Sequence, residues 1–167
     1  MKVAIITEGG RQIGFGHITR CIALSDGFQE RRIKPFFLIN GDNTIKKLLK
    51  GKEFLIFNWL KERRRLLNFL KDTDIALIDS YRANLSLLRD ISKTAKLTVY
   101  LDDYKRLNYP KGVVLNSSDY ILDLRYPRRP GIKYLLGYKF TLLRRQFWLT
   151  QRKRIIRTVK TIMVTFG

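Results

Sequence analysis

The chain of 167 residues is 45% hydrophobic and 12% aromatic, carries a formal net charge of +20 and contains one cysteine. This composition suits a single packed domain, argues against intrinsic disorder, excludes an intrachain disulfide framework and supplies no apolar run of the roughly 18–20 residues that span a bilayer. The charge predicts a polyanionic partner such as nucleic acid, anionic lipid or a phosphate-bearing substrate.

Short aliphatic runs rich in β-branched residues recur along the chain and predict strands. The first, Lys2–Thr7, is continuously apolar, which favours a parallel sheet covered on both faces. Further strands are predicted at Phe36–Ile39, Phe54–Phe57, Ile75–Ile78, Leu97–Leu101, Tyr120–Leu122 and Thr161–Phe166. Helices are predicted at His17–Arg32, Thr44–Leu49, Leu60–Lys71, Leu85–Ser92 and Arg144–Thr158. The alternation predicts a Rossmann-like, doubly wound α/β sheet, which binds ligands at the carboxyl ends of its strands.

Three loops lie at the carboxyl ends of predicted strands: Glu8–Gly16, Asp79–Asn84 and Asp102–Arg106. The first of them holds four glycines in eight residues, which lets the backbone turn sharply and a ligand approach main-chain N–H groups. Neither common phosphate motif is present there. A P-loop needs Lys and Ser/Thr after its last glycine, and the dinucleotide motif needs a glycine where Thr19 stands.

His17, the chain's single histidine, stands where this glycine loop enters the helix. A helix N-terminus disfavours the imidazolium form, so the neutral ring is a candidate general base. The alternative is a helix-capping or surface histidine without a catalytic role. Cys21 follows one helical turn after His17, but these two residues alone are too few ligands for a metal site. The preferred interpretation of Cys21 is a cysteine buried on the apolar stripe of the helix.

The other two loops supply further polar candidates. Tyr81 is interpreted either as a hydrogen-bonding partner of a sugar hydroxyl or phosphate, or as a tyrosine that covers the sheet end. Asp79 is interpreted as a helix-capping carboxylate. Asp102 and Asp103 are adjacent and point to opposite faces, so we expect one to cap and the other, Asp103, to face a ligand.

The segment IGFGHITRCIALSDGF resembles the N-terminal signature of the UDP-sugar hydrolases of pseudaminic acid biosynthesis and of related spore-coat polysaccharide proteins. Their pattern is roughly I-G-x-G-H-x-x-R-C-x-x-L-A, which is matched here by Ile13, Gly14, Gly16, His17, Arg20, Cys21 and Leu24. IDSY (78–81), LDDYKR (101–106), YLLGYKFTLLRRQF (134–147) and the VTFG that ends the sequence agree in order. Asn116 stands where the family has an asparagine, although an ordinary turn also suits it.

The resemblance implies a two-domain glycosyltransferase-B architecture, similar to the transferase that completes lipid II. Residues 1–143 would form the N-terminal, sugar-facing domain, and 144–167 a linker helix and the first strand of a nucleotide-binding domain. The implied reaction releases UDP from an activated amino or deoxy sugar, with His17 activating water and no metal or cofactor. Substrate-binding residues would be Gly14, Phe15, Gly16, Arg20, Tyr81, Asp103 and Asn116. We expect a cytoplasmic protein, with this chain alone inactive and binding UDP weakly.

The departures from the family pattern leave the sugar and the reaction type open. Ile6 and Glu8 stand where members often carry Arg and Asp, and Ser80 stands where many carry His. One alternative is therefore a glycosyltransferase of the same architecture acting at the membrane surface, where the basic segment 59–71 would make peripheral contact. A nucleic-acid-binding domain is ranked last, because no known nucleic-acid motif is present. Residues 124–167 hold 12 basic and no acidic residue, beside the expected interdomain cleft.

Overall fold

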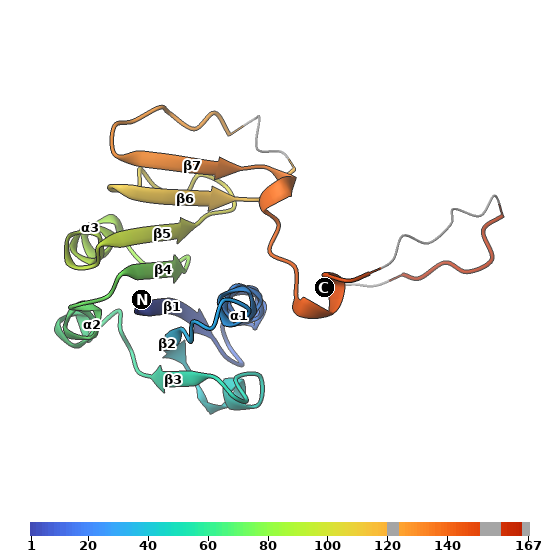
Figure 1. Ribbon diagram of the computed structural model, residues 1–167, viewed down its shortest axis with the longest axis horizontal. Helices are drawn as coiled ribbons and strands as arrows, with labels where there is room; N and C mark the ends of the chain where they lie inside the picture. Colours follow the sequence, from blue (N-terminus) through green and yellow to red (C-terminus); the bar gives the residue numbers. More distant parts are fainter. Residues whose placement is uncertain (120–123, 151–157, 165–167) are drawn as a thin grey trace.

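The computed structural model describes residues 1–119, 124–150 and 158–164. Within them the chain forms a seven-stranded, all-parallel sheet with the strand order β3-β2-β1-β4-β5-β6-β7 (Figure 1). The strands are β1 (Val3–Gly9), β2 (Phe36–Gly41), β3 (Glu53–Ile56), β4 (Ile75–Asp79), β5 (Leu97–Leu101), β6 (Gly112–Asn116) and β7 (Ile132–Leu136). The order runs outward in both directions from β1 and β4, which places the topological switch point between these two strands.

Helices cover both faces of the sheet. Figure 1 shows α1 (Gly16–Gln29) on one face, with α2 (Arg63–Leu70) and α3 (Leu85–Thr94) on the other. Short 3₁₀ helices are formed by Asn43–Lys47, Tyr138–Phe140 and Arg145–Phe147. No helix in the described part of the chain is long and apolar enough to cross a membrane.

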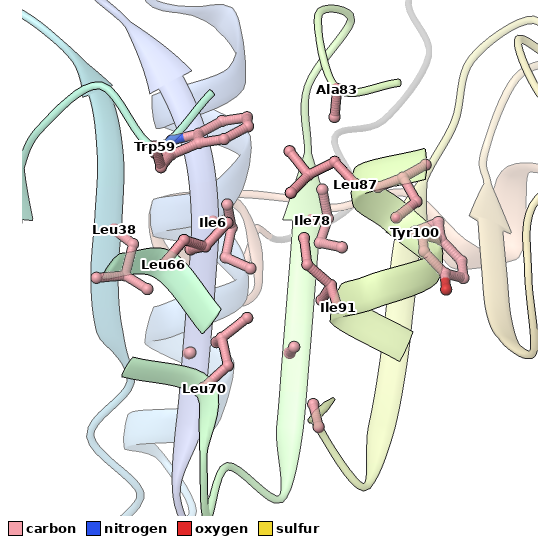
Figure 2. Packing of buried hydrophobic residues seen from close by; sticks show 14 of the residues in the cluster. Ile6, Leu38, Trp59, Leu66, Leu70, Ile78, Ala83, Leu87, Ile91 and Tyr100 are labelled. Atoms are coloured by element: carbon pink, nitrogen blue, oxygen red, sulfur yellow. The ribbon is translucent and has the colours of Figure 1, made fainter. Parts of the chain in front are cut away.

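Alternate residues of the strands belong to two separate hydrophobic cores, because successive side chains of a strand point to opposite faces of the sheet. Ile5 and its neighbours pack beneath α1, whereas Ile6 belongs to the cluster beneath α2 and α3. Figure 2 shows this second cluster, in which the indole of Trp59 lies over Ile6. Trp59 is fully buried and donates its Nε1–H to the Thr7 carbonyl oxygen over 2.9 Å. The hydrogen bond ties the loop before α2 to the carboxyl end of β1.

The first five predicted strands and the helices that separate them are confirmed, with boundaries shifted by a few residues. The helix predicted at Thr44–Leu49 is a 3₁₀ helix, and the one predicted at Leu60–Lys71 begins only at Arg63. Strands β6 and β7 were not predicted, because GVVLN and IKYLL lie beside Pro and Gly residues that favour a loop. The strand predicted at Tyr120–Leu122 lies outside the described residues.

Two predictions near the C-terminus are wrong for the residues that the structure describes. The predicted helix Arg144–Thr158 is only the short Arg145–Phe147 turn, and 151–157 lie outside the described residues. In the sequence of 144–158 the basic residues would lie all around the axis of such a helix. No continuous apolar stripe would then be left to pack against the domain. The predicted strand Thr161–Phe166 is not formed over 161–164, where the apolar side chains are 72–85% exposed. A strand needs a neighbouring strand to complete its hydrogen bonds.

Candidate functional site

The loops that follow β1, β4 and β5 converge at the topological switch point, as the sequence predicts. The β1 loop leads into His17 and Arg20 on the first turns of α1. Asp79 ends β4 and Tyr81 follows it, while Asp103 lies two residues after the end of β5. Hydrogen bonds join these five side chains into one cluster, described next bond by bond.

Asp79 orients the imidazole of His17. Its carboxylate is buried, with 1% of the side chain exposed, and its Oδ1 lies 2.7 Å from His17 Nδ1. A carboxylate can only accept, so Nδ1 carries the proton in this bond, and the second ring nitrogen, Nε2, is the one that can take a proton. The prediction that Asp79 caps a helix is wrong. Asn84 caps α3 instead, its side chain accepting from the Leu87 N–H, because β4 ends too far before that helix.

Arg20 is held between two carboxylates. It donates from Nε and Nη2 to the two oxygens of Asp79, over 2.9 and 2.6 Å, and from Nη1 to Asp103 Oδ1, over 2.6 Å. This two-point contact with Asp79 is the paired geometry in which a guanidinium binds a carboxylate most strongly. Arg20 was predicted to bind substrate. In the structure three of its N–H groups bond to Asp79 and Asp103, so Arg20 holds both carboxylates in place, and its contact with a substrate stays a prediction.

Tyr81 joins the cluster through both its hydroxyl and its ring. The hydroxyl donates to Asp103, and the ring packs edge-on against the His17 imidazole at a centroid distance of 4.6 Å. The Tyr104 ring also packs against the Tyr81 ring, at a centroid distance of 5.4 Å, and both residues are nearly half exposed. The predicted ligand-facing Asp103 is therefore part of the cluster, with its partly exposed carboxylate beside two accessible aromatic rings.

The charges around His17 favour its protonated form. Burial lowers the pKa of His17, but the hydrogen bond to Asp79 and the charge of that carboxylate raise it; Arg20 opposes and Glu8 adds to the rise. The net pKa lies above the ordinary value of 6.5. The sequence argument from the helix N-terminus expected the neutral ring to be favoured, and the buried Asp79 carboxylate reverses that direction.

The pKa values of Asp103 and Cys21 are shifted in opposite directions. Burial raises the pKa of Asp103, yet hydrogen bonds from Arg20 and Tyr81 outweigh it, so the net pKa is lowered and the carboxylate stays ionised. Burial raises the pKa of the Cys21 thiol well above its ordinary value, and the nearby Asp79 charge adds to the rise. Cys21 is buried with its Sγ 3.7 Å from Asp79 Oδ2, as expected for a protonated cysteine on the inner side of α1.

The glycine loop folds back on itself before α1 begins. Gly10 and Gly14 exchange two backbone hydrogen bonds of 3.0 and 2.8 Å, and both have positive φ angles. The Gly14 N–H was predicted to face the substrate; it is bonded to the Gly10 carbonyl instead, because the loop closes tightly there. Phe15 and Gly16 are exposed at the start of α1, where the first N–H groups have no earlier carbonyl within the helix.

Asn116 belongs to a second polar group rather than to the His17 cluster. It is fully buried, donates from Nδ2 to the Tyr126 hydroxyl over 3.1 Å and accepts from the Ser118 N–H over 2.8 Å. Tyr126 donates in turn to Asp102 Oδ2 over 2.5 Å, and Asp102 Oδ1 accepts from the Arg106 N–H. Asp102 thus secures the loop after β5, as the predicted division between the two aspartates requires.

Sequence reasoning missed Asp79, Glu8 and Tyr104 as members of the site. Glu8 is 1% exposed and accepts a hydrogen bond from the Tyr81 N–H over 2.9 Å. A signal for Asp79 and Glu8 was available, since both are charged residues at the end of an otherwise apolar, buried strand, where an isolated charge is costly.

Comparison with known proteins adds a relative but no activity. No protein-family model matches the chain. An uncharacterized protein of Methanocaldococcus jannaschii is 22% identical over an alignment of 178 residues, which covers all of this chain and 37% of the relative. The chain thus spans well under half of that relative's length, and the function has to be inferred from the geometry at the switch point.

Proposed function

We propose that this chain is the sugar-facing part of a nucleotide-sugar hydrolase that releases UDP from an activated amino or deoxy sugar. In this proposal residues 1–143 form the N-terminal domain of a glycosyltransferase-B-type protein, and 144–167 lead into a nucleotide-binding domain. The sequence resemblance suggests the reaction class, and the parallel sheet with its switch-point cluster is compatible with it. The 22% identical relative extends beyond the match, as a second domain would require.

The observation that carries the proposal is the His17–Asp79 pair. A buried carboxylate bonded to Nδ1 fixes the ring and its tautomer, which is how a general base is prepared. In the proposed step Nε2 takes a proton from water while the water oxygen bonds to the anomeric carbon. The bond from that carbon to the diphosphate oxygen breaks, and UDP leaves with the electron pair. Three exposed aromatic residues can lie against the sugar: Tyr81, which packs on His17; Tyr104, which packs on Tyr81; and Phe15, two residues before His17 in the chain.

The test is UDP release by the full-length protein from a panel of UDP-, GDP- and CMP-activated sugars, with His17→Asn beside the unaltered enzyme. Loss of a general base lowers kcat by about 10²–10⁴-fold. Because the pKa of His17 is raised, kcat/KM should increase with pH through a value above 6.5, as the ring becomes neutral. Lys93→Gln, at an exposed position in the last turn of α3, serves as the control and should leave kcat unchanged.

Retained UDP release by His17→Asn would remove the general-base role. The alternative reaction, transfer to a lipid or polysaccharide acceptor, uses the same base to deprotonate an acceptor hydroxyl instead of water. It would be selected if UDP release required an acceptor. Steeply salt-dependent binding of DNA or RNA without sugar turnover would instead support the nucleic-acid hypothesis.

A further inference from the structure

Glu8 is a buried carboxylate at the carboxyl end of β1 that the proposed reaction does not use. It lies in register with Asn40 of β2, and the two residues are 1% and 7% exposed. Among the described residues, neither Glu8 Oε2 nor Asn40 Nδ2 has a hydrogen-bond partner, although both atoms are buried. Burying a carboxylate with one oxygen unpaired is costly, so a carboxylate retained here calls for an explanation beyond packing.

The other oxygen of Glu8 reaches across the switch point to the β4 loop. Glu8 Oε1 accepts the Tyr81 backbone N–H over 2.9 Å, which ties the end of β1 to the residue that follows β4 by two positions. Tyr81 is therefore held twice, by Glu8 at its backbone and by Asp103 at its hydroxyl. Its ring is thereby set edge-on against His17 at 4.6 Å and 84°.

We propose that Glu8 is a positioning residue, which fixes the Tyr81 ring against the His17 imidazole and places a negative charge behind it. The inference rests on the proposed function only in taking His17 as the base. Among the described residues, the ionisable groups that pack against His17 or act on its charge are Asp79 from β4, Arg20 from α1 and Glu8 from β1, together with Tyr81 and Asp103 from the loops after β4 and β5. Asp79 orients the ring directly, whereas Glu8 acts through Tyr81 and through its charge, which favours the protonated imidazole.

Because His17 is the chain's single histidine, its ring signals in an NMR titration are unambiguous. Glu8→Gln retains an oxygen that can accept the Tyr81 N–H but removes the charge. We expect it to keep the chemical shifts that the Tyr81 ring imposes on His17 and to lower the midpoint of the His17 titration. Glu8→Ala removes the bond as well, so both the shifts and the midpoint should change. Glu30→Gln, at the far end of α1 and paired with Arg145, is the matched control and should change neither.

Unchanged His17 shifts and an unchanged midpoint in both variants would overturn the proposal. Altered His17 shifts in Glu8→Ala, together with a lowered midpoint in both variants, would support the proposal, and an unchanged midpoint in Glu8→Gln would overturn it. If Glu8→Ala does not fold, Glu8→Gln decides, and an unchanged midpoint overturns the proposal. A purely structural Glu8 would instead lower the urea midpoint of Glu8→Gln while leaving His17 unaffected. The titration needs no substrate, so this test can fail or succeed independently of UDP release.

Discussion

Asp79→Asn is the substitution that tests the architecture of the site most directly. Asparagine keeps one oxygen, which can still accept from His17 Nδ1 and Arg20 Nη2, but it places an NH₂ group where Oδ2 accepts from Arg20 Nε. Two donors then face each other, and the charge that stabilises protonated His17 is gone. We expect the pKa of His17 to fall, because burial and Arg20 both lower it once Asp79 no longer opposes them.

The cost in stability follows from the bonds that change. Losing one charge-assisted bond costs about 1.5–3 kcal/mol, and replacing a carboxylate oxygen by an amide oxygen roughly halves the strength of the two that remain. Arg20 keeps its bond to Asp103 and its side chain is 24% exposed, which places the total near the lower end, at about 3 kcal/mol. A domain of ordinary stability, about 5–15 kcal/mol, survives this loss and remains measurable.

The loss should depend on pH. A histidine whose pKa is raised on folding contributes stability that is fully present below its unfolded value, here 6.5, and disappears as the pH rises through the folded value. Asp79→Asn removes that contribution, so its destabilisation should be larger at about pH 6 than at about pH 9. Urea unfolding followed by tryptophan fluorescence measures the free energies, and the His17 titration measures the pKa.

The matched control is Asp26→Asn. Asp26 lies on α1, as His17 does, but farther along the helix, and the substitution breaks its ion pair with Lys52. It should leave the His17 titration unchanged. An unchanged titration midpoint in Asp79→Asn, or a destabilisation equal at both pH values, would refute the assignment of Asp79 as the group that holds and charges His17.

Two further predictions concern the packing that supports the site. A Cβ on Gly41 would lie 1.9 Å from the Gly9 carbonyl oxygen, so Gly41→Ala should lower the free energy of unfolding by at least about 1–3 kcal/mol. Gly27→Ala, with open space around its Cβ in α1, should instead raise it by about 0.5–1 kcal/mol, and the opposite order in urea unfolding would contradict the packing. Trp59→Phe loses the hydrogen bond to Thr7 and leaves a cavity, which should cost about 2–4 kcal/mol by the same measurement. Trp148→Phe, at a residue 39% exposed, should cost less than about 1 kcal/mol, and equal costs for the two tryptophans would refute the buried role of Trp59.

The first five strands of the fold could be predicted from largely apolar runs in the sequence. Continuous β-branched runs such as Val3–Thr7 bury both faces, and their pattern alone identifies a parallel sheet. Strands β6 and β7 escaped because five residues beside glycine and proline also fit a loop. Whether such a segment is a strand or a loop depends on its pairing with a neighbouring strand, which the local sequence does not reveal.

The location of the site could be predicted from the sequence, but the contacts among its residues could not. The rule that ligands bind at the carboxyl ends of parallel strands brought His17, Tyr81 and Asp103 together correctly. What the rule cannot give is the distribution of hydrogen bonds among them. Arg20 holds Asp79 and Asp103 through three hydrogen bonds, a role that its place in the sequence does not indicate, and its predicted contact with a ligand stays a prediction.

In the proposed function, the charges of the cluster decide which part of the nucleotide sugar would lie against it. Three carboxylates, Glu8, Asp79 and Asp103, meet at the switch point, while the guanidinium of Arg20 is engaged by two of them. A diphosphate placed against this cluster would meet net negative charge, and the repulsion is strong where water is scarce. The net charge of +20 is therefore not concentrated where the chemistry is proposed, and 12 basic residues lie in 124–167 instead. In the proposed function the cluster would therefore face the sugar and the attacking water, and basic groups outside it would hold the diphosphate.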